Sequence, residues 1–243
     1  MLKNILTCFN KDFKFYFQSK MIYLLVAIYG IMLFAFVLYS TDFLSNTTQN
    51  LHQFFSMQLA VMSMIIPATT MRAWADEYKH GTLDILFSLP MNKWAIVLGK
   101  FLAAWAVCSI LVLSTILFCF ILSLFVQLSS ITIFINYIII LLFCGCLCAL
   151  SIFASAIFNN MLGAFVMSLA ICSLFISMPF EKFVTKIIPD NVFFAHLAAS
   201  FNFGNIYDIM INGQIYVSSI IYLLLLGTAS LWLTTVMVEY KRS

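Results

Sequence analysis

The fold is decided by a stretch in the middle of the chain, residues 131–158, which reads ITIFINYIIILLFCGCLCALSIFASAIF. It contains no Asp, Glu, Lys, Arg or His, and it exceeds the roughly 20 apolar residues that a bilayer-spanning helix needs. The same absence of these five residue types extends outward over 101–180. A segment of that length without such groups must cross the membrane several times, so the core is predicted to lie in lipid.

The composition of the whole chain agrees with a membrane environment. Of its 243 residues 64% are hydrophobic and 9% are charged, whereas soluble domains carry about 25% charged residues. We therefore expect an all-α, polytopic integral membrane protein that forms a single domain over 1–243. Six apolar runs of suitable length are predicted to be its transmembrane helices: 21–39, 53–74, 95–125, 131–158, 161–180 and 217–238.

The basic residues indicate how these spans are oriented, because cytoplasmic segments carry an excess of Lys and Arg. With six spans, ten of the twelve basic residues fall on one side, which is predicted to be cytoplasmic together with both termini. These ten are Lys3, Lys11, Lys14, Lys20, Arg72, Lys79, Lys93, Lys100, Lys241 and Arg242, leaving Lys182 and Lys186 outside.

The first twenty residues combine an apolar face with positive charge. Leu2, Ile5, Phe9 and Phe13 share one side of a helix, and four lysines accompany them. Such a segment is typical of a helix that lies in the membrane interface and contacts anionic headgroups. Residues 1–20 are therefore predicted to be an interfacial helix, with membrane lipids as its partners.

Residues 76–94, DEYKHGTLDILFSLPMNKW, form a polar stretch between two apolar runs. Thr82 is suited to cap a short helix, and Pro90 ends it because the residue before a proline avoids the α region. Leu83, Leu86 and Phe87 follow the i, i+3, i+4 spacing of a single helical face. An apolar face on the aqueous side indicates a soluble partner.

The order of residues around this stretch resembles the first cytoplasmic loop of type-2 ABC exporter permeases, especially the small gliding-motility-associated group. The resemblance implies a coupling helix that docks in a groove of a separate ATPase subunit, and a second permease subunit, identical or paralogous. It also implies that the chain is not itself an enzyme and lies in a bacterial inner (plasma) membrane. The implied ATPase-coupling residues are Arg72, Asp76, Glu77, Gly81, Thr82, Leu83, Leu86, Phe87, Pro90 and Lys93, and Gly99 and Lys100 complete the motif.

A long connection before the last run is not polar enough for a solvated loop. Residues 191–202 and 205–211 can form two short helices there, and backbone at membrane depth must satisfy its own hydrogen bonds. The family carries re-entrant outer helices at this place. Residues 181–213 are therefore predicted to be an outer re-entrant segment.

Other functions leave weaker signals. Cys144, Cys146 and Cys148 favour a copper export permease by ligand type, but alternate residues of a helix point to opposite sides. An ion-coupled secondary carrier would need intramembrane carboxylates or histidines, which the uncharged stretch lacks. A non-transporting membrane scaffold is a third alternative. No phosphate-binding loop, catalytic pair, cofactor site, metal site or nucleic-acid partner is predicted.

Overall fold

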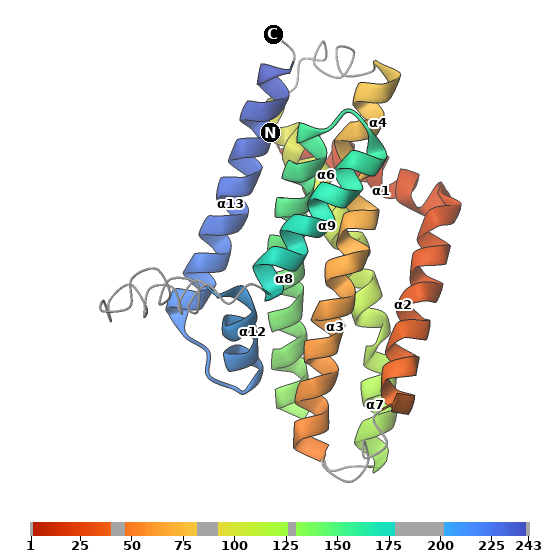
Figure 1. Cartoon of the computed structure of the whole chain (residues 1–243), viewed down its shortest axis with the longest axis vertical. Helices are drawn as coiled ribbons and strands as arrows, with labels where there is room; N and C mark the ends of the chain where they lie inside the picture. The colour runs from red at the N-terminus through yellow and green to blue at the C-terminus, as the bar shows by residue number, and fades with distance from the viewer. Residues whose placement is uncertain (1, 40–46, 82–91, 126–129, 178–201, 242–243) are drawn as a thin grey trace.

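The computed structural model describes residues 2–39, 47–81, 92–125, 130–177 and 202–241, which form helices and contain no strand (Figure 1). The all-α prediction is confirmed. The helices are α1 (Leu2–Gln18), α2 (Lys20–Tyr39), α3 (Thr47–Thr70), α4 (Arg72–His80), α6 (Lys93–Ser114), α7 (Ile116–Phe125), α8 (Ser130–Ile157), α9 (Met161–Ser177), α12 (Phe203–Ile211) and α13 (Val217–Tyr240).

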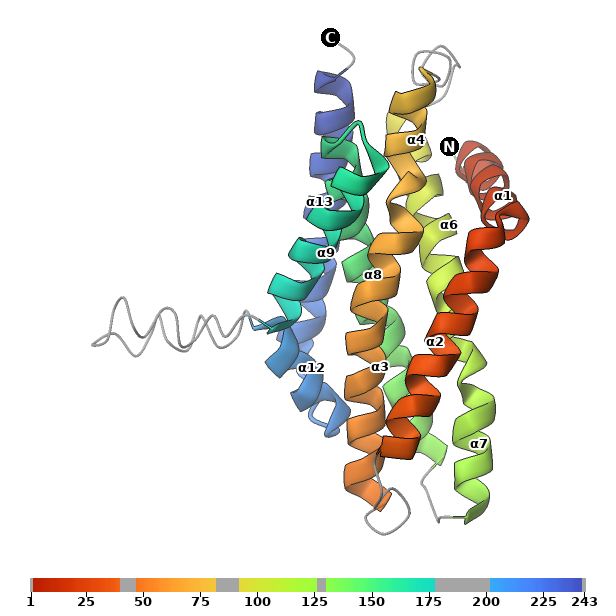
Figure 2. The same cartoon turned by 45° about the vertical axis from the view of Figure 1, so that its right-hand side comes forward.

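Helix α8, formed by the uncharged central stretch, is the centre of the bundle (Figure 1, Figure 2). It packs against α3, α4, α6, α9, α12 and α13. Many of its apolar side chains, including Ile140, Phe143, Leu147 and Ile152, are completely buried, whereas Ile131, Phe134 and Ile138 near its start are exposed. A helix that is apolar all round suits a position with many neighbours.

The cysteines of α8 belong to this core. Cys144, Cys146 and Cys148 are buried, and the sulfur of Cys148 lies 3.7 Å from that of Cys108 on α6. Within the described ranges, no three His, Cys, Asp or Glu side chains are grouped so that they could hold a metal ion. These cysteines act as small apolar packing residues.

Four described helices are long and apolar enough to cross a membrane: His52–His80, Lys93–Phe120, Ile131–Ile157 and Val217–Tyr240. The pair Lys3–Gln18 and Lys20–Ala35, bent by 71°, is a fifth candidate if it counts as one span, and Met161–Ser177 is a shorter apolar helix. Each of the six predicted runs thus coincides largely with a helix. The count of six spans itself stays a prediction.

A chain of polar side chains links the helices inside the bundle. The amide Nε2 of Gln58 on α3 donates to the hydroxyls of Tyr29 at 2.8 Å and Thr115 at 3.0 Å. Thr115, which separates α6 from α7, also lies 2.8 Å from the hydroxyl of Tyr137 on α8. Hydrogen bonds between helices stabilise such contacts where water is excluded.

Helix α12 corresponds to the second of the two short helices that were expected before the last span. The side chain of Asn202 accepts from the backbone N–H of Asn205, which caps the helix. Its buried face includes Phe203 and Tyr207, and the Tyr207 hydroxyl donates to the carbonyl of Phe55 at 2.8 Å. The first expected helix, 191–202, lies almost wholly outside the described residues, and the re-entrant character of the segment stays a prediction.

Helix α1 lies directly on α6, and Gly99 makes this close approach possible (Figure 2). A Cβ at Gly99 would come within 2.5 Å of the Cβ of Cys8 and 3.2 Å of the backbone nitrogen of Phe9. Part of the predicted apolar face of α1 is thus used against α6, whereas Leu6, Phe15 and Phe17 remain exposed. The break between α1 and α2 at Ser19 separates the predicted interfacial helix from the first predicted span.

We expect Gly99→Ala to displace α1, because the added methyl group meets the α1 backbone and not a mobile side-chain end. Overpacking of this kind costs about 1–3 kcal/mol. The matched control is Gly227→Ala on α13, where an added Cβ meets nothing within 4 Å. Thermal unfolding of the purified variants should show a lower midpoint for Gly99→Ala and an unchanged or higher one for Gly227→Ala. Equal midpoints for the two variants would contradict the α1–α6 contact.

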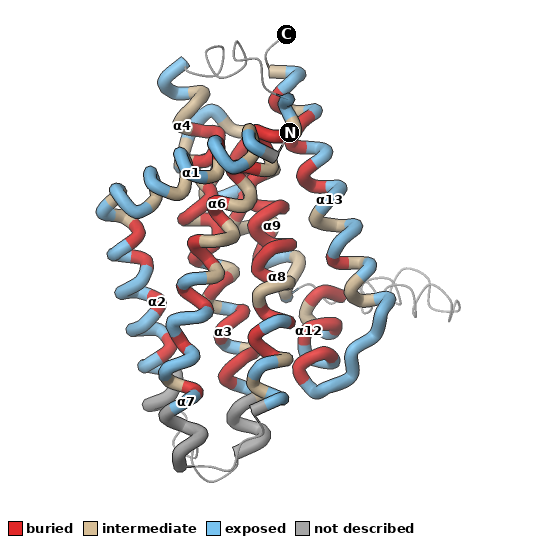
Figure 3. The backbone as a smooth tube through the Cα atoms, turned by 180° about the vertical axis from the view of Figure 1, so that it is seen from behind, coloured by how far each residue is buried: buried red, intermediate tan, exposed pale blue. Residues whose placement is uncertain are grey.

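Helices α2 and α13 lie on the outside of the bundle and expose large apolar side chains (Figure 3). Leu24 and Phe34 on α2, and Leu225 and Trp232 on α13, are each more than half exposed. Surfaces of this kind suit contact with lipid tails, which are as apolar as the side chains themselves.

Candidate coupling site

The described basic residues gather at one end of the bundle, where Figure 1 shows the chain termini and the tip of α4. The described lysines and arginines are carried by α1, by α4, or by the ends of α2, α6 and α13 that face this direction. They are Lys3, Lys11, Lys14, Lys20, Arg72, Lys79, Lys93, Lys100 and Lys241.

Helix α4 continues α3 beyond the apolar run and carries the first part of the predicted coupling loop. It ends at Gly81, whose φ of 64° is the left-handed conformation that glycine adopts readily. The N–H of Gly81 bonds back to the carbonyls of Glu77 and Tyr78. Gly81, one of the predicted coupling residues, thus terminates α4.

The predicted site residues divide into two groups. Five lie at the charged end: Arg72, Asp76, Glu77, Gly81 and Lys93. The other five, Thr82, Leu83, Leu86, Phe87 and Pro90, lie outside the described residues. The apolar face of the coupling helix therefore stays a prediction.

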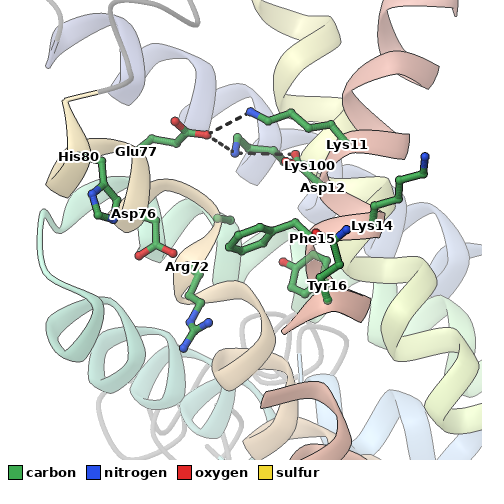
Figure 4. Close-up of a pocket in the computed structure, with 12 residues that line it drawn as sticks. Lys11, Asp12, Lys14, Phe15, Tyr16, Arg72, Asp76, Glu77, His80 and Lys100 are labelled. Atoms are coloured by element: carbon green, nitrogen blue, oxygen red, sulfur yellow. Dashed lines mark hydrogen bonds and ion pairs between the residues drawn. The ribbon is translucent and has the colours of Figure 1, made fainter. Parts of the chain in front are cut away.

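A buried lysine joins three helices beneath this loop (Figure 4). The Nζ atom of Lys100, on α6, lies 3.3 Å from Oε1 of Glu77 on α4 and 3.7 Å from Oδ2 of Asp12 on α1. The Lys100 side chain is 7% exposed, and its ammonium also lies 5.2 Å from the ring centroid of Trp74. Because a buried charge is costly unless it is paired, these contacts hold α1, α4 and α6 together.

The polar backbone of the α3–α4 junction is fixed to the central helix. The Ser155 hydroxyl on α8 donates to the carbonyl of Met71 at 3.1 Å and accepts from the N–H of Trp74 at 3.3 Å. One turn away, the hydroxyls of Thr70 and Ser151 are in contact. These bonds connect the helix before the coupling segment to the core of the bundle.

The helix after the coupling segment is fixed in a similar way. The side chain of Asn92 caps the start of α6, and Lys93 forms an ion pair with Glu239 near the end of α13. Lys241 donates to the carbonyl of Ile157 at 2.6 Å and lies 4.2 Å from the ring centroid of Tyr78. Partial burial lowers the pKa of Lys241 below the usual lysine value.

A crevice of about 540 Å³ opens between α1, α4 and the first part of α6 (Figure 4). The side chains of Phe15 and Tyr16 reach into it from α1, and Arg72, Asp76 and Glu77 line it from α4. Three of the predicted coupling residues therefore face α1. The sequence analysis did not predict a role for Asp12 or the burial of Lys100. A lysine inside an apolar helix was nevertheless a signal, because such a charge requires a partner carboxylate.

These features define a multi-pass helical membrane protein with a charged, multi-helix junction at one end. The chain matches the family described as ABC-2 family transporter protein over residues 6–238. Since the match covers nearly the whole chain, the protein belongs to this family and is a membrane permease component of an ABC transporter. The predicted type-2 ABC permease is confirmed, whereas the gliding-motility-associated group stays a prediction. No curated protein matched the chain.

Proposed function

We propose that the protein is the transmembrane subunit of an ATP-driven exporter and forms half of its translocation path. A second permease subunit, identical or paralogous, supplies the other half, and ATP hydrolysis resides in a separate ATPase subunit. The whole chain, 1–243, acts as one transmembrane domain with both termini in the cytoplasm of a bacterial cell. Export, as opposed to uptake, rests on the resemblance of the 76–94 region to exporter permeases.

One observation carries the proposed coupling. The segment 82–91 is flanked by α4 and α6, and Lys100 pairs with Glu77 across these two helices and with Asp12 on α1. A force applied to the segment would therefore reach three helices at once. Met71 and Trp74 are bonded to α8, so the same displacement would reach the core.

The proposed contact with the ATPase is the apolar face of Leu83, Leu86 and Phe87. It would dock in a groove of the ATPase, as amphipathic helices do in other complexes. Arg72, Asp76, Glu77 and Lys93 lie on the two helices that flank this segment, and Gly81 and Pro90 would limit the docking helix. The exposed apolar surfaces of α2 and α13 leave room for lipid and for the second permease subunit.

Affinity purification of the tagged chain from its native membranes tests this function. We expect an ATPase subunit with Walker motifs to co-purify, and its ATP hydrolysis to be faster with the permease than without it. Recovery of the chain without any ATPase under mild solubilisation would contradict the proposal. In that case a membrane scaffold or secondary carrier would account better for the chain.

The proposed orientation has its own test. Single cysteines at positions 46 and 186 should react with a membrane-impermeant maleimide applied from outside, because both positions are expected to lie beyond the membrane. A cysteine at Lys79, exposed near the tip of α4, should react only after permeabilisation. The native cysteines of the described residues are buried, so the background should be low. The reverse labelling pattern would overturn the orientation.

A further inference from the structure

The charged crevice continues into an apolar cleft towards the membrane. The cleft lies between the α1–α2 junction and α3, and Met21, Ile22, Leu25 and Ala68 contribute to its walls. The two cavities share Phe15, Tyr16 and Arg72. A polar compartment that opens into an apolar cleft at one arginine has the two-part chemistry of a phospholipid, with a headgroup and a hydrocarbon chain.

The charges in the crevice leave two cations available. Lys100 and Lys11 are engaged with Glu77, and Lys100 also with Asp12. Arg72 and Lys14 line the crevice, and neither has a carboxylate within ion-pair distance among the described residues. Figure 4 shows the ammonium of Lys14 turned away from the guanidinium of Arg72, so Arg72 is the cation that an anion inside the crevice would meet.

Arg72 is oriented for such an anion. Its Nη1 donates to the hydroxyl of Ser19 at 3.3 Å, at the junction of α1 and α2. Its Nε atom is buried and has no hydrogen-bond partner within the described part of the chain. Figure 4 shows the guanidinium turned away from Asp76. A guanidinium with an unused N–H suits the paired oxygens of a phosphate, and leaving a buried donor unsatisfied is costly.

The position of Asp76 indicates which kind of lipid headgroup would fit the crevice. It lines the same crevice, and its Oδ1 atom is buried without a donor among the described residues. A bare phosphate would leave this acceptor unsatisfied and would be repelled by its charge. A headgroup that carries hydroxyls beyond the phosphate would satisfy it, because a hydroxyl donates to a carboxylate.

We propose that the crevice between α1 and α4 is a headgroup site for an anionic phospholipid of the phosphatidylglycerol type. Its phosphate lies on Arg72, and a headgroup hydroxyl donates to Asp76. One acyl chain leaves along the cleft between α2 and α3. The cleft encloses only about 20 Å³, so the chain lies along its mouth with its other side towards the bilayer. The site does not depend on the docking of an ATPase.

The test measures lipid binding to the delipidated full chain in detergent by native mass spectrometry. Wild-type protein should bind the first dioleoyl-phosphatidylglycerol at least about tenfold more tightly than dioleoyl-phosphatidylcholine, since charge-assisted hydrogen bonds contribute about 1.5–3 kcal/mol. Arg72→Gln should reduce the affinity for phosphatidylglycerol about tenfold. Lys14→Gln should reduce it by no more than about twofold, because Lys14 is exposed and its ammonium is turned away from Arg72. If Arg72→Gln fails to fold, Arg72→Lys decides the matter, because it keeps the charge but loses the paired N–H groups and should bind phosphatidylglycerol more weakly than wild type.

Lys3→Gln and Lys20→Gln are matched controls. They remove the same charge from exposed positions on α1 and at the start of α2, but neither residue lines the crevice or the cleft. Both should retain affinity within about twofold of wild type, because exposed charges are largely screened. Equal losses in all four variants would overturn the site and indicate diffuse attraction to a basic surface. Competition by millimolar inorganic phosphate, or equal binding of phosphatidylethanolamine, would overturn the assignment to an anionic lipid.

Discussion

Changing Leu86 and Phe87 together to Asp is expected to weaken association with the ATPase subunit by several orders of magnitude. Burying a large apolar side chain typically contributes about 1.5–3 kcal/mol, and each 1.4 kcal/mol is tenfold in affinity. The substitution removes two such side chains and would bury two charges in their place. Membrane insertion should be unaffected, because both residues lie outside the apolar runs. The measurement is pull-down of the ATPase together with its permease-stimulated ATP hydrolysis.

Ser88→Asp provides the matched control for this prediction. It introduces one of the two negative charges into the same segment, but at helical spacing it falls on the side away from Leu83, Leu86 and Phe87. We expect it to retain binding and coupling close to those of the wild type. If the double Asp variant also binds and couples normally, the contact with the ATPase lies elsewhere on the chain.

The second large effect is expected from Lys100→Met. This change keeps much of the apolar stem of the side chain but removes the ammonium that pairs with Glu77 at 3.3 Å and Asp12 at 3.7 Å. Both carboxylates are mostly buried, with side chains 15% and 17% exposed. Removing one partner of a buried ion pair costs about 3–5 kcal/mol where the remaining charge is left uncompensated, which applies to Asp12, since Glu77 keeps its ion pair with Lys11. A lower thermal unfolding midpoint and separation of α1 from α4 are expected.

A rescue variant separates the loss of charge pairing from a general packing defect. Adding Asp12→Asn and Glu77→Gln to Lys100→Met removes the two carboxylates that lose the Lys100 ammonium, while keeping side chains of similar shape. We expect the triple variant to recover most of the lost stability, and a cysteine pair on α1 and α4 to report that the helices are together again. A triple variant less stable than Lys100→Met alone would show that the cluster is not held by charge pairing.

Much of the fold could be predicted because it depends on local composition. The uncharged residues of α8 favour contact with other apolar helices, and the structure places that helix at the centre of the bundle. The turn at Asn159 and Asn160 and the short helix α12 also follow signals carried by nearby residues. The break at Thr115 was not predicted, since nothing in its apolar surroundings distinguishes it; its hydroxyl bonds to side chains of other helices.

The site could be predicted only in part, because its key contacts join residues that are far apart in the sequence. The region from Arg72 to Lys100 carries a recognisable order of residues, but no local pattern pairs Lys100 with Asp12 on α1. Gly99 was noted as part of the motif, yet its role depends on the approach of Cys8 and Phe9. Similarly, Arg72, Asp76 and Glu77 were expected to face a partner groove, and their orientation towards α1 emerges only from packing.

Site-specific photo-crosslinking in native membranes tests the central claim most directly, namely that the segment following α4 docks on an ATPase subunit. A photoreactive amino acid is placed at Leu86 and, in a second variant, at Asn212, which is exposed after α12. We expect ultraviolet light to produce an adduct with the ATPase from position 86 and none from position 212. An ATPase adduct from position 212 alone, or none from position 86 in a chain that inserts and assembles normally, would contradict the claim.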